Sequence, residues 1–330
     1  MKTLFYLGIY LPSLLIYLIT KKTPKYMYIA QRRLFMSTGG KFNDVISSII
    51  SKIRGKYDIS NSKGILGDLS QEDAKKISNE IEENGFYIFD TKISDEFIEK
   101  VTHFSSVTPS KIIDINKKHV QVTTDEFIID RDNILSPKYS FDGSRLVSNE
   151  TIQDLVFDEN LLHIAQEYLG TKPIFDSIAL WFSAPFNNEG TSAAAQEFHF
   201  DMDRIKFLKF FVYLSDVGTE NGPHCYVPKS HKTPLPKEFR KDGRVPDERI
   251  EEYYGKPLEI CKPKGSIMLV DTRGFHKGKP LTSGERLLLQ MEYTNSLLGQ
   301  KTPSFKAKKI TNIEKYKKYK RTFQLIKIDD

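Results

Sequence analysis

Helical spacing of apolar residues dominates the first half of the chain. In "LSQEDAKKISNEIEENG", Ile77 and Ile81 fall on one face, and Ser70 is placed to cap the first turn. Gly85 is placed to end this helix, and "FYIFD" (86–90) then has the pattern of a strand. These signals predict a helix followed directly by a strand.

Two further helices are predicted before residue 171. Ser94 precedes an acidic first turn formed by Asp95 and Glu96, which favours a helix start. The segment "NETIQDLVFDENLLHIAQEYLG" (149–170) has the pattern of one helix that ends at Gly170. The stretch that follows the apolar N-terminus, up to about residue 65, is basic and poorly periodic.

The pattern changes to short strands from residue 173. "PIFDSIALWFSAP", "FLKFFVYLSDV", "HCYVPKS", "GSIMLVDT" and "RLLLQMEYTN" are aromatic or β-branched runs separated by turn signals such as "NNEG" and "ENGP". Many short strands at this spacing indicate a sandwich, barrel or jelly roll. The charged segment 232–262 interrupts them and is predicted to form a lid over one mouth of the β core.

The apolar N-terminus leaves three interpretations open. "LFYLGIYLPSLLIYLI" (4–19) falls short of the ~20 residues of a comfortable membrane span, and Pro12 interrupts it. It could be a membrane anchor, a targeting segment or a packed helix. Lys21, Lys22 and Lys25 follow it and would keep the rest of the chain on the cytoplasmic side of a membrane. We therefore expect a cytoplasmic protein that is associated with a membrane if this segment is an anchor.

Charge and cysteine content narrow the class of protein. The net charge of +6 is concentrated at the two ends, within 1–33 and 306–321, so the body of the chain is acidic. This distribution argues against a nucleic-acid groove through the domain and is compatible with basic ends that meet a membrane surface. A solvated helix is the alternative for the tail. The two cysteines, Cys225 and Cys261, are expected to be free thiols in a reducing compartment.

An imidazole and a carboxylate interrupt an apolar run near residue 200. In "AQEFHFDMDRIKFLKFF" (195–211), predicted to be a buried strand, His199 and Asp201 would point to the same face. A charged group in such an element is costly unless something binds it, and a metal ion is one candidate. Asp203 is a weaker candidate for the carboxylate, because it can pair with Arg204 instead.

A catalytic iron needs a third ligand from a neighbouring strand, as in the facial triad of two histidines and one carboxylate. His276, in "RGFHKGKP" after the predicted strand "GSIMLVDT", is the best choice. His103, His119 and His163 precede the β region and are interpreted as surface or core residues. His231 is interpreted as a structural hydrogen-bonding residue.

Arg286 begins another predicted strand, in "GERLLLQ", ten residues after His276. A guanidinium there can hold a carboxylate in bidentate fashion, which suggests an anionic co-substrate that chelates the metal. We expect 2-oxoglutarate, with its keto acid on the metal and its far carboxylate on Arg286. Trp181 is interpreted as a core residue, and the face on which Lys209 lies is left open.

At this point the sequence resembles the phytanoyl-CoA dioxygenase family of Fe(II)/2-oxoglutarate-dependent oxygenases. "QEFHFDMDRIKFLKFFVYLSDVGTENGPHCYVPKSHK" and "KGSIMLVDTRGFHKGKPLTSGERLLL" are similar to its two signature segments. The resemblance implies a mainly β fold, a double-stranded β-helix (cupin-like jelly roll) flanked by helices. It also implies that His199, Asp201 and His276 bind the iron and act in catalysis, and that Arg286 binds the co-substrate.

The resemblance covers roughly residues 70–297, which we treat as the dioxygenase domain. It leaves an apolar segment (1–25), a basic connecting region (26–69) and a basic C-terminal tail (298–330) outside. The implied reaction uses O2, decarboxylates 2-oxoglutarate to succinate and oxidises a small or lipid-like substrate. Because Asp201 is present, where related halogenases carry a small residue, hydroxylation is favoured over halogenation.

Three departures from the family pattern stand near the site. Phe198 occupies a position where an indole is common, and Lys229 one where glycine is usual. Gly278 replaces a hydroxyl residue, so the second contact to the co-substrate carboxylate is unassigned. Two other functions are left open: a jelly-roll binding protein without catalysis and a cupin-type metal isomerase. The substrate and the oligomeric state are not legible from the sequence.

Overall fold

The core of the protein is an eight-stranded antiparallel sheet in the order β3-β11-β8-β13-β7-β6-β4-β5. In this computed structural model, residues 2–116, 121–186, 194–232, 235–240 and 244–329 are described. The strands are β3 (Phe86–Lys92), β4 (Ser110–Ile113), β5 (Val122–Phe127), β6 (Lys138–Ser140), β7 (Ile174–Ser183), β8 (Phe207–Tyr213), β11 (Ser266–Val270) and β13 (Arg286–Thr294).

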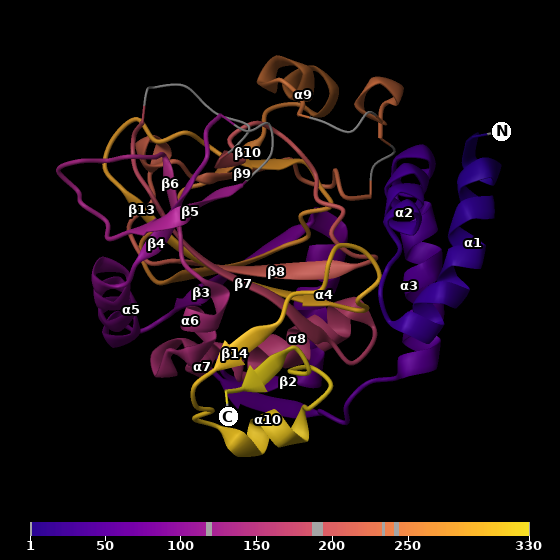
Figure 1. Ribbon diagram of the computed structural model, residues 1–330, viewed down its shortest axis with the longest axis horizontal. Coiled ribbons are helices and arrows are strands. Elements are labelled where there is room, and N and C mark those ends of the chain that lie inside the picture. The colour runs from indigo at the N-terminus through magenta and orange to yellow at the C-terminus, as the bar shows by residue number, and fades with distance from the viewer. Residues whose placement is uncertain (1, 117–120, 187–193, 233–234, 241–243, 330) are drawn as a thin grey trace.

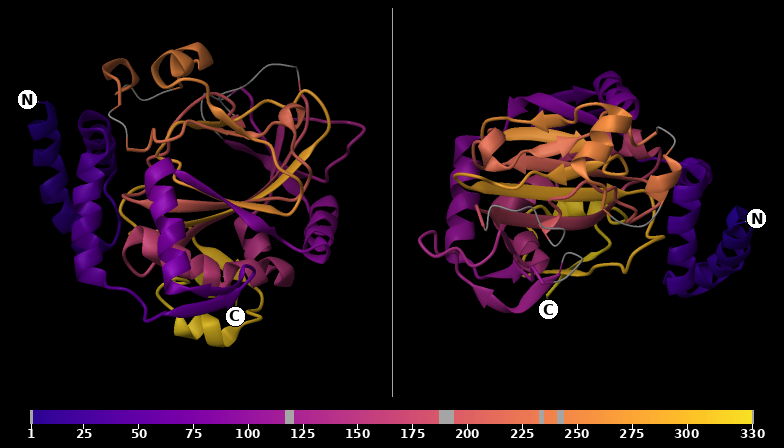
Figure 2. Two further views of the ribbon diagram at one scale, coloured as in Figure 1. Left: turned by 180° about the vertical axis from the view of Figure 1, so that it is seen from behind. Right: turned by 90° about the horizontal axis from the view of Figure 1, so that it is seen from above.

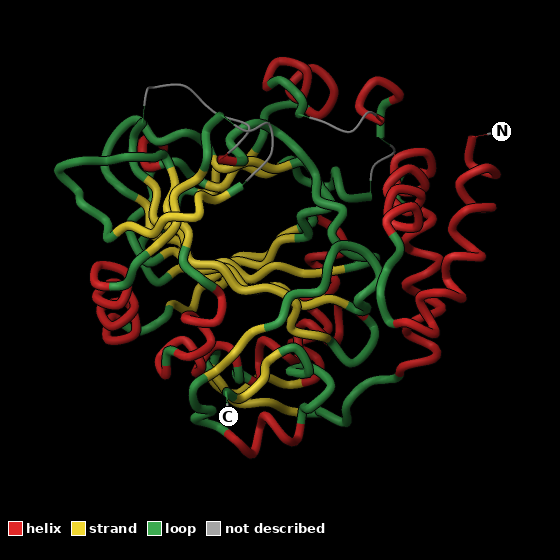
Figure 3. Tube along the Cα trace, viewed as in Figure 1, coloured by secondary structure: helices red, strands yellow, loops and turns green. Residues whose placement is uncertain are grey.

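A smaller sheet in the order β10-β9-β12 lies opposite one face of the larger one (Figures 1 and 3). Its strands are β9 (His224–Tyr226), β10 (Leu258–Ile260) and β12 (His276–Gly278). Two facing antiparallel sheets of this kind form a jelly roll. The prediction of a mainly β, cupin-like core flanked by helices is therefore confirmed.

Both faces of the large sheet are covered, which explains its nearly continuous apolar strands. On β8, Leu208, Phe210 and Val212 belong to the large core cluster that includes buried side chains of the helices. Phe211 and Tyr213 point the other way, into a cluster shared with the small sheet. This alternation places Lys209 on the face that looks toward the small sheet.

Most helices cover the outer face of the large sheet or one end of the molecule, whereas α9 (Asp247–Tyr254) lies beside the small sheet (Figure 1). The others are α1 (Lys2–Thr20), α2 (Lys25–Thr38), α3 (Lys41–Arg54), α4 (Gln71–Asn84), α5 (Asp95–Val107), α6 (Gly143–Ser148), α7 (Glu150–Val156), α8 (Glu159–Leu169) and α10 (Ile313–Lys318). Short strand pairs, β1 (Asn61–Gly64) with β2 (Gly67–Ser70) and β14 (Phe305–Ala307) with β15 (Ile326–Ile328), complete the fold.

The local signals for α4 and α5 are confirmed. Ser70 and Asp73 form a reciprocal capping box at the start of α4, and Gly85 ends the helix in the left-handed conformation. Ser94 accepts a hydrogen bond from the Phe97 amide at the start of α5.

The single helix predicted for 149–170 is wrong: α7 ends at Val156 and α8 begins at Glu159. The break occurs because the Asp158 side chain accepts a hydrogen bond from the Leu161 amide and so starts a new helix.

The basic region before residue 65 is not irregular, as the sequence suggested, but forms α2 and α3. Together with α1 these helices stand beside one end of the jelly roll (Figure 2). Helix α1 contains an 18-residue window, Thr3–Thr20, with mean hydropathy 1.7, which is long and apolar enough to cross a membrane. Of that window, 17% is buried inside the protein.

The C-terminal tail packs onto the domain. Tyr319 and Phe323 are buried in the large core cluster, and Lys309 pairs with Glu150. Figure 1 shows α10 at the bottom of the molecule, well away from α1. The tail is thus a folded part of the protein.

Candidate metal centre

Backbone pairing brings His199 and His276 together. The His199 amide donates to the His276 carbonyl at 3.0 Å, and the His276 amide donates to the His199 carbonyl at 2.8 Å. The ring centroids lie 4.3 Å apart. The strand predicted for 195–211 is wrong in its first half, because β8 begins only at Phe207; His199 lies on an extended segment that pairs with β12.

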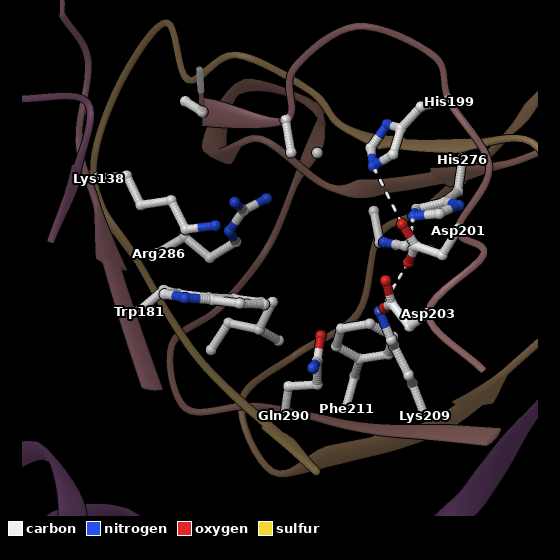
Figure 4. A pocket seen from close by; sticks show the side chains of 15 residues that line it. Lys138, Trp181, His199, Asp201, Asp203, Lys209, Phe211, His276, Arg286 and Gln290 are labelled. Carbon is white, nitrogen blue, oxygen red and sulfur yellow. Dashed lines mark hydrogen bonds and ion pairs between the residues drawn. The ribbon is translucent and has the colours of Figure 1, made fainter. Parts of the chain in front are cut away.

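Asp201 lies beside the two rings. Its amide donates to the Thr272 carbonyl at 2.8 Å, which fixes the backbone. One carboxylate oxygen is 3.8 Å from His199 Nε2 and the other is 3.5 Å from His276 Nε2. Within the described part of the chain, one potential ligand atom from each of these residues lies within 4.8 Å of the others, close enough to share one metal ion. The sequence predicted this juxtaposition (Figure 4).

The protonation state of both histidines suits a metal. His199 Nδ1 lies 2.9 Å from the Glu197 carbonyl, and His276 Nδ1 lies 2.9 Å from the Gly274 carbonyl. Because a carbonyl only accepts, each Nδ1 carries the proton and each Nε2 presents a lone pair. Burial lowers the pKa of His199 to about 4 and that of His276 to about 3, so both rings are neutral near pH 7. This donor set fits a divalent ion such as Fe(II).

Lys209 supplies the positive charge closest to the carboxylate. Its ammonium donates to Asp201 Oδ2 at 2.6 Å and lies 3.7 Å from Asp203 and 3.6 Å from Glu292. Burial alone would raise the pKa of Asp201, but Lys209 holds it well below its usual range. Burial and neighbouring Asp201 raise the pKa of Asp203 to about 6. Of the two carboxyl groups Asp201 therefore has the lower pKa, and Asp203 lies outside the group of potential metal ligands.

A cavity of about 310 Å³ extends from this group to Arg286. Figure 4 shows Arg286, Lys138 and Trp181 across the cavity from the His and Asp side chains. The Arg286 side chain is buried, and its guanidinium donates to the Gly222 carbonyl while Nε has no partner. Gly278 lines the same cavity, so this position offers no hydroxyl to a ligand.

Lys138 and Trp181 both line the cavity, and Lys138 was missed from the sequence. Lys138 is buried and its ammonium lies 3.7 Å from the centroid of the Trp181 ring. Burial and then Arg286 lower the pKa of Lys138 to about 7. Trp181 packs against the buried cluster between the two sheets, as a core residue does, and it also lines the cavity. No local signal marks Lys138, because its position depends on the pairing of β6 with β7.

The remaining histidines include two that form structural contacts and one that lines the cavity. His163 is buried and contacts Ser62 and Gln71, and His231 Nε2 contacts the Glu82 carbonyl, as structural residues do. His103 is exposed, and His119 lies outside the described residues. His224, which the sequence did not single out, lines the cavity with its ring centroid 5.5 Å from that of His276.

The segment 232–262 covers the metal-ligand segment on one side. Phe239 precedes α9 and Ile250 lies within it, and both pack in one cluster with Phe198 and Phe275, the neighbours of the two histidines in sequence. The described part of this insertion therefore packs against the outer side of the metal-ligand segment, and none of its described residues lines the cavity, so the predicted lid over the mouth stays a prediction.

Comparison with known proteins identifies a family whose model matches this sequence. A family model for phytanoyl-CoA dioxygenase (PhyH) matches residues 71–287. No curated protein matches significantly.

Among solved structures, the chain is similar to the non-heme α-ketoglutarate-dependent epimerase SnoN from nogalamycin biosynthesis. This match has a TM-score of 0.51, 13% identity and coverage of 68% of this chain and 84% of SnoN. HygX from Streptomyces hygroscopicus, solved with nickel and 2-oxoglutarate, matches with a TM-score of 0.47 and 16% identity, and the match covers 71% of this chain and 91% of HygX. EctD from S. alaskensis, solved with iron, matches with a TM-score of 0.48 and 15% identity, and the match covers 73% of this chain and 83% of EctD.

The likeness to SnoN supports the fold alone, whereas the family match covers about two thirds of the sequence and includes all four predicted site residues. The chain belongs to the phytanoyl-CoA dioxygenase family, whose enzymes use iron and 2-oxoglutarate.

Proposed function

We propose that this oxygenase binds Fe(II) through His199 Nε2, His276 Nε2 and the Asp201 carboxylate and hydroxylates a small or lipid-like substrate. The observation that carries the proposal is the convergence of two neutral Nε2 atoms and one ionised carboxylate within 4.8 Å, beside a cavity. A facial set of three protein ligands leaves further positions on the metal for other molecules.

Arg286 is proposed to hold the far carboxylate of 2-oxoglutarate. Its guanidinium is buried and lines the cavity opposite the metal group, where a charge-assisted pair is strong. Lys138 lies on the same side and is proposed as the second contact that Gly278 cannot provide. Together the two side chains would offer positive charge to an anion whose other end reaches the metal.

Iron and 2-oxoglutarate, when bound, supply the oxidising power that activates O2 and removes hydrogen from a C–H bond. The protein's own part is positional. The carbonyls of Glu197 and Gly274 orient the two imidazoles, and Lys209 keeps Asp201 ionised.

Residues 70–297 are proposed to be the catalytic unit, on the cytoplasmic side of any membrane that the N-terminus contacts. The buried Cys225 and exposed Cys261 are free thiols, which supports a reducing compartment. Hydroxylation is proposed as the reaction because Asp201 occupies the carboxylate position.

The proposal is tested by succinate release from 2-oxoglutarate with added Fe(II) and O2. His199→Ala should abolish turnover, while Arg286→Ala should mainly raise the concentration of 2-oxoglutarate required. Equal activity of wild type and both variants would reject the oxygenase assignment. Metal binding without any consumption of 2-oxoglutarate would favour an isomerase or a binding protein. Candidate substrates can then be ranked by how far they stimulate succinate formation.

A further inference from the structure

Helix α1 turns its apolar side away from the protein. Tyr10 and Ser13, at helical spacing, are 0% and 2% exposed and face the protein interior. Leu15 and Ile19 are 63% and 83% exposed on the opposite side. The same outward side includes further large apolar residues: Leu4, Phe5, Leu11, Ile16 and Leu18. A surface helix of a globular protein normally has the reverse arrangement, with its apolar stripe toward the core.

The inward side of α1 is held by the rest of the domain. Tyr10 packs edge-on against Phe42 of α3, with ring centroids 4.9 Å apart. Residues of α1 and α2 share one buried cluster with Ile205 of the oxygenase domain and with Leu298, which directly follows it. Moving α1 away would expose Ala30 and Leu34 of α2, which are fully buried. The exposed apolar side is thus a fixed feature of the folded protein.

Positive charge borders this side. Residues 1–33 contain six basic residues and no acidic residue. Lys21, Lys22 and Lys25 are exposed directly after α1. Anionic lipid headgroups attract such clusters, and an apolar face plus a basic patch gives two independent contributions to membrane binding. A protein partner would require neither a continuous run of Leu, Ile and Phe nor this absence of acids.

We propose that the outward side of α1 docks on an anionic lipid bilayer, with the helix axis in the plane of the membrane. Because α1 and α2 pack side by side, a membrane-spanning α1 would carry Arg32 and Arg33 of α2 to the depth of the acyl chains (Figure 2). That burial is costly, whereas an in-plane helix inserts only its apolar side.

The docked helices lie next to the metal centre. Phe35 of α2 stacks on Phe200, with centroids 5.7 Å apart, and Phe200 lies between His199 and Asp201 in sequence. Phe35 also belongs to the cluster that includes Phe239 and Ile250 of segment 232–262. The bilayer surface would therefore be separated from the metal-ligand segment by the α1–α2 layer.

The test is co-sedimentation of the full chain with vesicles of phosphatidylcholine and phosphatidylglycerol (7:3) or of phosphatidylcholine alone. The wild type should bind the anionic vesicles, and more weakly at high salt. The variant Leu11→Gln/Leu15→Gln/Leu18→Gln should lose at least about tenfold in partition coefficient. The matched control Val107→Gln/Ile128→Gln/Leu135→Gln, which removes exposed apolar residues outside α1–α3, should bind as the wild type does.

A second pair of variants distinguishes the contributions of the basic residues at the two ends of the chain to vesicle binding. Lys21→Gln/Lys22→Gln/Lys25→Gln should weaken binding to anionic vesicles, whereas Lys317→Gln/Lys320→Gln/Lys327→Gln in the folded tail should not. Both remove three exposed charges, and neither touches the cavity.

Several outcomes would overturn the proposal. One is the absence of binding to either kind of vesicle. If light scattering then finds a dimer that the triple leucine variant converts to a monomer, the outward side of α1 is an interface between two copies of the chain. Loss of binding in the tail variant alone would also contradict it. Resistance of vesicle-bound protein to extraction at alkaline pH would indicate that α1 spans the bilayer and would contradict the in-plane orientation.

Discussion

Replacing Arg286 by glutamine is expected to weaken 2-oxoglutarate binding without unfolding the protein. The side chain is buried in the cavity wall at the start of β13. Glutamine keeps a polar amide in the cavity wall but removes the charge and the forked geometry.

The magnitude follows from what the carboxylate would lose. Two charge-assisted hydrogen bonds in a buried site are worth about 1.5–3 kcal/mol each. Because Lys138 would retain part of the attraction, we take a loss of about 3 kcal/mol, which corresponds to about a 150-fold rise in Kd.

Titration calorimetry with the Mn(II)-loaded protein measures this Kd without turnover. The control is Arg131→Gln, because Arg131 forms an exposed ion pair with Glu285, directly before Arg286. This control should change the Kd less than about twofold. If Arg286→Gln binds 2-oxoglutarate within threefold of the wild type, and its thermal unfolding is unchanged, Arg286 does not hold the co-substrate.

Three further predictions test other parts of the site and fold. Since the pKa of Lys138 is lowered to about 7, its ammonium form is present below pH 7 and lost above it. The Kd for 2-oxoglutarate should therefore rise about tenfold from pH 6 to pH 8. The variant Lys138→Met should remove this pH dependence. Lys209→Met should lower the free energy of unfolding of the metal-free protein by about 3–5 kcal/mol, as measured by urea denaturation. Mn(II) should restore part of this loss, because the metal would neutralise the Asp201 carboxylate. An equal loss with and without the metal would contradict this prediction. Gly85→Ala should cost about 2–4 kcal/mol, because a Cβ at this left-handed position would meet the Tyr226 hydroxyl. Gly170→Ala, at another left-handed position where the nearest atom is the Ser51 Cβ at 3.3 Å, should cost only about 1–2 kcal/mol.

The parts of the fold that the sequence predicted well are those with local signals. The capping box of Ser70 and Asp73 and the left-handed Gly85 depend only on residues a few positions apart. The apolar runs of β7, β8 and β13 are buried on both faces, so they stand out without any knowledge of pairing.

Helices α2 and α3 were missed although α3 has helical spacing, with Phe42, Ile46 and Ile50 recurring every four residues. In α3, polar Asn43 and Ser47 are buried, since Asn43 donates to the Ile205 carbonyl and Ser47 accepts from Asn295. Apolar Val45 and Ile49 of the same helix are exposed. The helical period is therefore present in the sequence, but it does not indicate which side of the helix packs on the domain.

The convergence of His199, Asp201 and His276 was predicted, although the reasoning from strand alternation was incomplete. His199 and Asp201 converge on an extended segment whose direction is set by hydrogen bonds to His276 and Thr272, which are distant in sequence. Lys138 could not be found in this way. Nothing near it in the sequence indicates a site, and only the register of β6 against β7 brings it over Trp181.

The most direct test of the central claim is the number of Fe(II) ions bound per chain after anaerobic reconstitution and gel filtration. The wild type should bind one ion, and His199→Ala, Asp201→Ala and His276→Ala should each bind close to none while remaining folded. The matched variant His231→Ala, which removes a buried histidine outside the metal group, should still bind one. Undiminished iron in any of the three ligand variants would contradict the assignment of that residue to the metal.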